Sequence, residues 1–291
     1  MGKALAEASA AARRVFEEAD DALGFAISSL CFEGPEDQLK LTENTQPALL
    51  TVSVAALSVL GEHGLDSFDY VAGHSLGEYS ALVATGSLRF ADAVRLVRQR
   101  GRYMQEAVPP GAGAMAAILK LPDGKLESVL EEAAQGEVVS AANLNSPDQV
   151  AIAGHAGAVK RAIELAKAAG ARRAVLLPVS APFHCALMAP AQRRLGADLD
   201  AIKFQDLSHP LVNNWQAREI HTGAEAREGL YQQVPNPVRW VESIRHLAAQ
   251  GVRRFVEVGA GGVLTGLLRS IDASVAGIKF GEPGDLEKVK G

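Results

Sequence analysis

Residues 68–82, FDYVAGHSLGEYSAL, decide the fold. A short β-prone run at residues 69–72 ends at Gly73, and a helix is predicted to begin after Ser75. Residues 73–77 then have the form G-x-S-x-G, which is typical of a nucleophile elbow, a sharp strand-to-helix turn that exposes the serine hydroxyl. Glycine is expected two residues before and after the serine because side chains there would collide with the neighbouring strand and helix.

The same turn predicts an oxyanion site. The first backbone N–H groups of a helix lack internal partners, and the helix dipole favours negative charge at that end. We therefore expect the N–H of Leu76 to stabilise an oxyanion beside Ser75. An ordinary glycine-flanked turn would give the same five letters, but the strand before it and the helix after it favour the elbow.

Composition limits the class of protein. The 291 residues are 48% hydrophobic, enough to bury the core of one large domain, with or without an insert. A net charge of −5 gives no support to nucleic-acid binding through a broad basic face. No apolar run approaches the roughly 18 residues of a membrane span, and residues 1–21 lack a signal-peptide core, so a cytoplasmic location is expected. Cys31 and Cys185 lack the spacing of metal ligands, and we expect free thiols, no metal and no cofactor.

The order of predicted elements indicates an α/β fold in two parts. Residues 111–178 read strand, helix, strand, strand, helix, strand, which is the pattern of a ferredoxin-like subdomain. Residues 1–110 and 179–291 alternate helices with strands, which predicts an α/β-hydrolase-like catalytic domain whose parallel sheet is covered on both faces. In this large domain we expect helices at residues 3–22, 25–30, 42–61, 90–108, 190–201, 226–233, 238–250 and 263–271, and strands at 69–72, 211–214 and 255–259.

A serine nucleophile needs a base, which is usually histidine. His74 adjoins Ser75 but is expected to point away from it in such a turn, which suits contact with substrate. His184 follows a strand and a proline-stiffened loop, a good position for a side chain aimed into a cleft. Geometry alone leaves the choice of base open, although the remaining histidines lie in settings that favour surface or local roles: His63, His155, His209, His221 and His246.

Several stretches taken together resemble the malonyl-CoA:acyl-carrier-protein transacylase family of fatty-acid synthesis. They are GHSLGEYSALVATG (73–86), RLVRQRGRYMQEAVPPGAGAMAAI (95–118), NLNSPDQVAIAGH (143–155), LPVSAPFHCALM (177–188), NPVRWVESI (236–244) and EVGAGGVLTGL (257–267). The resemblance runs along nearly the whole chain. Acyltransferase domains of polyketide synthases share these motifs, so the family is better defined than the pathway.

The resemblance implies a catalytic pair. Ser75 matches the serine that is acylated, and His184 matches the base of a Ser-His dyad. The family orients this histidine through a carbonyl rather than a carboxylate, and Gln233 stands at the corresponding place. No acidic residue is then required to complete a triad. Leu76 would supply one oxyanion N–H.

The resemblance also implies a substrate site. Arg100 matches the arginine that binds the malonyl carboxylate, a task suited to a planar donor of two hydrogen bonds, although the residues alone would favour a solvated charge on an arginine-rich helix. Gln46 matches a glutamine that lines the same cleft. Asn143 and Asn145 would border the cleft, but a turn role fits them equally. Phe183 resembles the malonyl-selective variants of the family.

The first residues depart from the family pattern. Its members begin with a strand and the turn Phe-Pro-Gly-Gln-Gly-Ser-Gln, whose first glutamine supplies a second oxyanion N–H, whereas Met1 falls where the family has entered the next helix. The missing strand would lie inside the sheet, and loss of one oxyanion donor typically lowers turnover about 100- to 1000-fold. We expect a start placed at an internal methionine rather than a shortened, impaired protein.

The sequence therefore predicts a ping-pong acyl transfer from malonyl-CoA to the phosphopantetheine thiol of acyl carrier protein, by a monomer. The alternatives are a polyketide-type acyltransferase, a serine thioesterase or hydrolase that uses water as acceptor, and a truncated, inactive homologue that binds carrier. Because carrier proteins are acidic, four arginines offer contacts for docking: Arg98, Arg102, Arg172 and Arg173.

Overall fold

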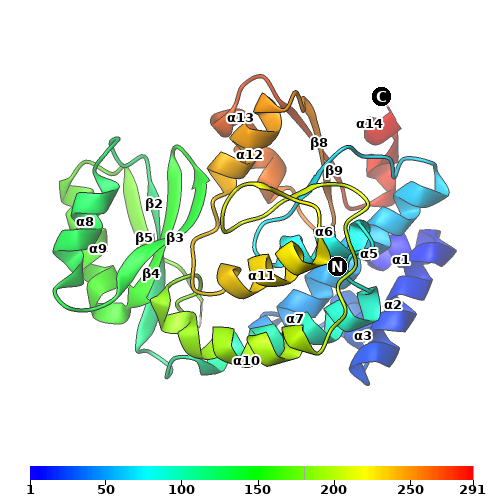
Figure 1. Cartoon of the computed structure of the whole chain (residues 1–291), viewed down its shortest axis with the longest axis horizontal. Helices are drawn as coiled ribbons and strands as arrows, with labels where there is room; N and C mark the ends of the chain where they lie inside the picture. The colour runs from blue at the N-terminus through cyan, green and yellow to red at the C-terminus, as the bar shows by residue number, and fades with distance from the viewer. Residues whose placement is uncertain (180, 291) are drawn as a thin grey trace.

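The computed structural model describes residues 1–179 and 181–290 and has a mixed α/β fold. Figure 1 shows a smaller lobe, formed by β2 to β5 with α8 and α9, beside a larger, mainly helical body that contains both chain ends. Within the described ranges, no helix is long and apolar enough to cross a membrane.

Helices form most of the larger body. The helix α5 (Thr42–Glu62) lies at its centre and packs against α2, α6 and α7, around a core that includes Leu50, Tyr79 and Leu82. The remaining helices are α1 (Lys3–Ala8), α2 (Ala10–Leu23), α3 (Ile27–Glu33), α4 (Glu36–Leu39), α6 (Leu76–Ala84), α7 (Phe90–Glu106), α10 (Ala189–Asp200), α11 (Gly223–Gln233), α12 (Trp240–Ala249), α13 (Val263–Ile271) and α14 (Leu286–Lys290).

The single helix predicted over residues 3–22 is two helices. Ser9 adopts an extended conformation between them and caps α2, since its Oγ accepts a hydrogen bond from the N–H of Ala12 at 3.0 Å. A serine at this position satisfies one of the free N–H groups of the new helix. Its hydroxyl also donates to Glu62 Oε2 at the end of α5, which joins the two helices.

The strands of the larger body fall into two sheets rather than the single parallel sheet that was predicted. One sheet pairs β1 (Val71–Ala72) with β6 (Leu211–Val212) in parallel and adds β7 (Glu219–Ile220) antiparallel to β6. The other pairs β8 (Arg254–Val258) with β9 (Ala276–Phe280) in parallel. Among the described residues, β1 and β8 each pair with one strand, so nothing joins the two sheets.

The smaller lobe has the predicted order of elements. Its four strands form an antiparallel sheet in the order β3-β4-β2-β5, and α8 and α9 pack with it around Ile118, Ile152 and Val159. Its elements are β2 (Gly113–Leu119), α8 (Leu126–Ala134), β3 (Val139–Ser146), β4 (Gln149–His155), α9 (Ala156–Ala168) and β5 (Arg173–Leu176). The turn role considered for Asn143 and Asn145 is wrong, because both lie within β3.

The strand β3 also joins the lobe to the body. The N–H of Leu144 donates to the carbonyl of Val238 at 2.9 Å, and the N–H of Val238 donates to the carbonyl of Ala142 at 2.9 Å. These bonds place the chain before α12 parallel to β3. Residues from both sides of this junction can therefore share one site.

The elbow between β1 and α6 has the predicted strain, but its two glycines are not equivalent. Ser75 has φ 52° and ψ −106°. A Cβ on Gly73 would lie 2.0 Å from the backbone carbon and oxygen of Gly77, so only glycine fits there. The collision expected at Gly77 is wrong, because a Cβ there would meet no atom within 4 Å.

We expect Gly73→Ala to destabilise the protein by about 1–3 kcal/mol or more, because the new methyl group must displace backbone. Gly77→Ala, the matched control, should leave the free energy of unfolding unchanged or raise it by less than about 1 kcal/mol, because alanine favours helix. Urea unfolding of both variants measures the difference. Equal destabilisation by the two substitutions would contradict this account of the elbow.

Candidate active site

Ser75 and His184 form a hydrogen-bonded pair. The Oγ of Ser75 lies 2.8 Å from Nε2 of His184, which is 4% exposed and lies just before α10. The Nδ1 of His184 lies 3.0 Å from the backbone carbonyl of Gln233, at the end of α11. A carbonyl can only accept, so Nδ1 carries the proton and Nε2 is left to accept from the serine hydroxyl.

Arg100 is buried on the other side of the serine. It extends from α7, is 2% exposed and donates from Nη2 to Ser75 Oγ at 3.0 Å. Its other partners are the side-chain oxygens of Gln46, at 2.6 Å, and Gln233, at 2.8 Å. The solvated role that the residues alone favoured is therefore wrong. Its partners are neutral, so the guanidinium is free to exchange a neutral acceptor for an anion.

The charge of Arg100 affects the histidine. Burial lowers the pKa of His184 most, and the positive charge of Arg100 lowers it further, to about 3. The hydrogen bond to the Gln233 carbonyl opposes this shift. The imidazole is therefore neutral at ordinary pH. A neutral imidazole is the form that can remove a proton from Ser75.

His74 connects the elbow to the smaller lobe. Its Nε2 lies 2.8 Å from Oδ1 of Asn145 on β3, and its ring meets that of Trp240 edge-on with 5.6 Å between centroids. Burial lowers the pKa of His74. Its bonded partner is thus Asn145 rather than Ser75, which fits the expectation that it points away from the serine hydroxyl.

Two residues that the sequence did not single out hold this arrangement. Asn214 accepts from the N–H of Ser75 at 2.6 Å and donates to the carbonyl of Gly73 at 2.6 Å. Glu78, fully buried on α6, accepts from the N–H of Asn214 at 3.0 Å and from Nε2 of Gln233 at 2.8 Å. Burial raises the pKa of Glu78 to about 7 although these bonds oppose the shift. The available signals were a pair of asparagines directly after a strand and a glutamate three residues after the serine.

The structure brings most of the predicted site residues together. Leu76 begins α6, and its backbone N–H finds no acceptor within the described part of the chain. Cys185 is buried with its thiol bonded to the carbonyl of Pro182, and the described residues contain no cluster of His, Cys, Asp or Glu that could hold a metal ion. One connected set of hydrogen bonds includes Ser75, His184, Gln233, Arg100 and Gln46.

Comparisons with known proteins place these residues in a family. Residues 1–279 match the family model described as acyl transferase domain. The malonyl CoA-acyl carrier protein transacylase of Escherichia coli (strain K12) is 51% identical over 268 residues, covering 92% of this chain and 87% of that protein. The corresponding protein of Bacillus subtilis (strain 168) is 48% identical over 288 residues, covering 99% and 90%.

Solved structures agree with the sequence comparisons. An acyl carrier protein S-malonyltransferase from Vibrio cholerae has a TM-score of 0.97 and 44% identity, covering 99% of this chain and 94% of that one. A malonyl-transacylase in complex with a type II PKS acyl-carrier protein has the same TM-score of 0.97, 44% identity and the same coverages of 99% and 94%.

The lowered pKa of His184 predicts an unusual pH profile. A serine that depends on a histidine of ordinary pKa loses reactivity below pH about 6.5. With a pKa of about 3, His184 stays neutral at lower pH, so Ser75 should react with a sulfonyl fluoride at a nearly constant rate down to pH about 5. Mass spectrometry of the modified protein measures this rate, and His184→Asn should be slow throughout. A half-maximal rate near pH 6.5 would contradict the burial argument.

Proposed function

The chain belongs to the acyl transferase domain family and, within it, to the malonyl CoA-acyl carrier protein transacylases, and we propose that it transfers malonyl from malonyl-CoA to the phosphopantetheine thiol of acyl carrier protein. It is an acyltransferase. The observation that carries the choice of substrate is the buried guanidinium of Arg100, 3.0 Å from Ser75 Oγ. A cation at this distance suits an acyl group whose own carboxylate lies close to the thioester carbonyl.

The first half-reaction acylates Ser75. His184 accepts the hydroxyl proton at Nε2 while Oγ bonds to the thioester carbonyl carbon. The oxyanion that forms is stabilised by the N–H of Leu76, at the positive end of α6. Collapse of this intermediate breaks the carbon–sulfur bond, and the departing CoA sulfur takes the proton from His184.

The second half-reaction reverses these steps with a new thiol. The carrier's phosphopantetheine sulfur gives its proton to His184 and bonds to the malonyl carbonyl carbon. The ester bond to Ser75 then breaks, and Oγ recovers the proton. Throughout, the carbonyl of Gln233 holds Nδ1–H of His184 and fixes the tautomer.

The malonyl carboxylate also strengthens the base. In the free protein the charge of Arg100 is the second cause, after burial, of the low pKa of His184. A carboxylate paired with Arg100, beside Gln46, neutralises that charge and so raises the pKa of His184 toward working pH. A monoacid such as acetyl leaves the charge in place. Selection of the diacid and activation of Ser75 are thus linked.

The carrier is proposed to dock at a groove beside the smaller lobe. Arg172, Arg173 and Lys120 line a groove of about 460 Å³ whose opposite wall is α13. The other two arginines already have partners, because Arg102 Nε lies 3.7 Å from Glu43 Oε2 and the Arg98 guanidinium lies over the ring of Phe25. Arg172 and Arg173 are therefore the better candidates for contact with an acidic carrier.

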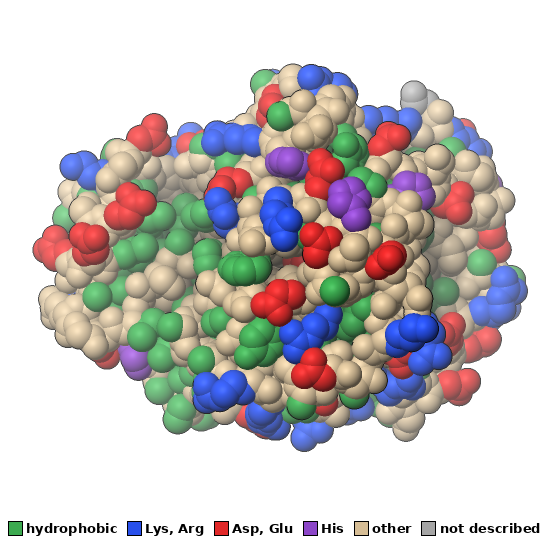
Figure 2. Space-filling model, in the orientation of Figure 1, with side chains coloured by type: hydrophobic (Ala, Val, Ile, Leu, Met, Phe, Trp, Pro, Cys, Tyr) green, Lys and Arg blue, Asp and Glu red, His purple; other side chains and the backbone are tan. Residues whose placement is uncertain are grey.

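The proposed domain bounds are those that the sequence predicts, although the strands of the larger body form two sheets. The α/β-hydrolase-like catalytic domain comprises residues 1–110 and 179–291, and the ferredoxin-like subdomain comprises 111–178, which the order β3-β4-β2-β5 supports. We propose a cytoplasmic monomer that needs no cofactor and binds no nucleic acid. On the face in Figure 2, acidic and basic side chains are interspersed, which supports the last point.

A polyketide pathway is the second candidate. The similar malonyl-transacylase solved with a type II PKS acyl-carrier protein favours it as an alternative to fatty-acid synthesis. Relative transfer rates to purified carriers of the two pathways decide between them. A hydrolase would instead release free malonate at the same rate with and without carrier.

Incubation with malonyl-CoA should add one malonyl group to the intact protein. The adduct should be absent from Ser75→Ala, because the ester forms on that hydroxyl. Intact-mass spectrometry measures it, and addition of carrier should remove it. A folded protein that shows no adduct would contradict the transfer and favour an inactive carrier-binding homologue.

Arg100→Ala should lower kcat/KM for malonyl-CoA about 10- to 100-fold more than for acetyl-CoA, since it removes a charged hydrogen bond to the carboxylate. Steady-state transfer to carrier with each donor gives the two ratios. Arg102→Ala, on the same helix but 47% exposed, is the matched control and should leave the malonyl preference unchanged. Equal losses on both donors for Arg100→Ala would refute the carboxylate role.

A further inference from the structure

We propose that Glu78 is a positioning residue that fixes the backbone on both sides of the nucleophile through Asn214 and Gln233. The inference rests on Ser75 being the nucleophile of the proposed function. The side chain of Glu78 bonds to neither the serine hydroxyl nor His184, so any effect of its carboxylate on the reaction passes through the residues that it holds.

Both peptide groups of Ser75 are held by amide side chains. Its N–H donates to Oδ1 of Asn214 at 2.6 Å. Its carbonyl accepts from Nε2 of Gln233 at 3.0 Å and from the backbone N–H of Glu78 at 3.2 Å. A non-glycine residue at φ 52° is strained and persists only where its surroundings over-determine it. The bonds from Ser75 to the side chains of Asn214 and Gln233 oppose relaxation of the turn, one at the N–H and the other at the carbonyl of the residue.

A single carboxylate oxygen bonds to the backbone of Asn214 and to the side-chain amide of Gln233. Oε2 of Glu78 accepts from the backbone N–H of Asn214 at 3.0 Å and from Nε2 of Gln233 at 2.8 Å. Its other oxygen, Oε1, is buried and has no hydrogen-bond partner among the described residues. The side chain is fully buried, so losing these bonds would leave buried polar groups unpaired.

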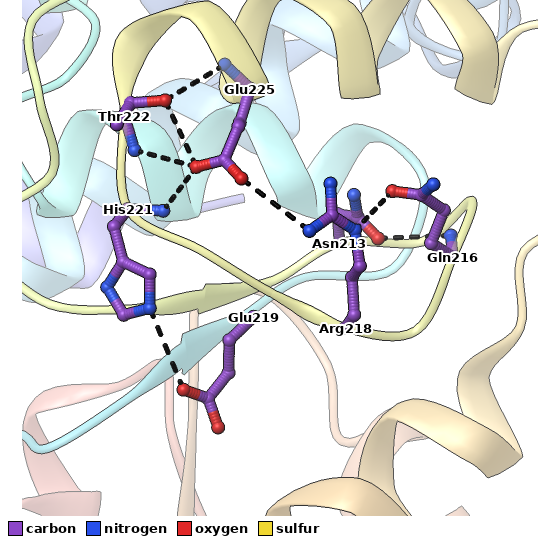
Figure 3. Close-up of polar contacts among 7 residues, drawn as sticks. All are labelled: Asn213, Gln216, Arg218, Glu219, His221, Thr222 and Glu225. Atoms are coloured by element: carbon purple, nitrogen blue, oxygen red, sulfur yellow. Dashed lines mark hydrogen bonds and ion pairs between the residues drawn. The ribbon is translucent and has the colours of Figure 1, made fainter.

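The local sequence would ordinarily use these residues differently. Ser75 is the N-cap of α6 and Glu78 its third residue, the S-x-x-E spacing of a capping box. In such a box the serine hydroxyl accepts a helix N–H and the glutamate accepts the N–H of the cap residue. Figure 3 shows that arrangement complete at Thr222 and Glu225, where α11 begins.

At α6 neither half of the box forms. The Ser75 side chain makes no capping bond and is bonded instead to His184 and Arg100. Asn214 accepts the hydrogen bond from the N–H of Ser75, which the glutamate of a capping box would accept. Glu78 accepts instead from the backbone N–H of Asn214. Because Asn214 bridges Ser75 and Glu78 by hydrogen bonds, the serine hydroxyl remains available for chemistry.

Asn214 lies in the turn that follows β6, and its side chain reaches Ser75 from that separate segment of the chain. Oδ1 of Asn213 accepts from the N–H of Gln216 at 3.0 Å (Figure 3). The N–H of Asn213 donates to the carbonyl of Arg218 at 3.0 Å. Asn213 is as buried as its neighbour but bonds within the turn. Asn213→Ala is therefore a matched control for the loss of a buried amide.

The test compares Glu78→Ala with Glu78→Gln. Glutamine can place its amide oxygen at the Oε2 position and keep both bonds, whereas alanine keeps neither. Because misplacement of a reacting group by about 1 Å can cost about 100-fold, we expect Glu78→Ala to lower the rate of Ser75 sulfonylation and kcat about 100-fold. KM for malonyl-CoA should change less than about threefold, and Glu78→Gln should retain both rates within about tenfold.

Asn214→Ala removes the acceptor for the N–H of Ser75 and should lower the rate of sulfonylation as Glu78→Ala does. It therefore serves as the test variant if Glu78→Ala does not fold. Asn213→Ala should lose thermal stability but keep the sulfonylation rate within about threefold at a temperature where it is folded. Unchanged rates in folded Glu78→Ala or Asn214→Ala would overturn the proposal. Equal losses in Glu78→Ala and Glu78→Gln would also overturn it, because they would assign the effect to charge.

Sulfonylation needs neither malonyl-CoA nor carrier. If the protein failed to transfer malonyl, the modification of Ser75 would still report how well the elbow is held. Failure of the proposed function and failure of the positioning role are therefore distinguishable.

Discussion

The strained backbone of Ser75 is the constraint on which the rest of the site depends. At φ 52° the residue turns the chain from β1 into α6 and leaves its hydroxyl exposed to His184. The turn is possible because Gly73 lets the backbone of Gly77 approach, and it is held by bonds from elements distant in the chain. Strain of this kind persists only where the surroundings over-determine it.

Electrostatics in the site follow from burial. A buried cation, a buried imidazole and a buried carboxylate lie within one set of hydrogen bonds formed by Arg100, His184 and Glu78 with Gln233. Burial is the first cause of each shift and favours the neutral form, so it lowers the pKa of His184 and raises that of Glu78. The site is therefore poised to respond strongly to one added negative charge beside Arg100.

The features that the sequence predicted correctly depend on residues close together in the chain. The elbow motif, the long helices α5 and α7 and the strand–helix order of residues 111–178 follow from periodicity and turn residues, and they were predicted within a few residues. The strand β7 was missed because it has only two residues, and β9 was missed although it is as long as β8. Periodicity also could not show that Arg100 faces the core, and the resemblance supplied its role. Glu78 and Asn214 were missed because their bonds join residues 136 apart.

Among the described residues, a backbone carbonyl rather than an acid orients His184, and this feature and the proposed selection of a diacid have one physical explanation. In serine triads a carboxylate orients the histidine and stabilises its protonated form. Here such a carboxylate would also lie near Arg100, and an ion pair between them would occupy the guanidinium that is proposed to bind the malonyl carboxylate. Gln233 avoids this conflict, because its backbone oxygen orients His184 and its side-chain oxygen gives Arg100 a neutral partner that an anion can displace. The carboxylate of Glu78 bonds to the nitrogen of that amide rather than to Arg100, which leaves the charge of Arg100 for the proposed substrate carboxylate.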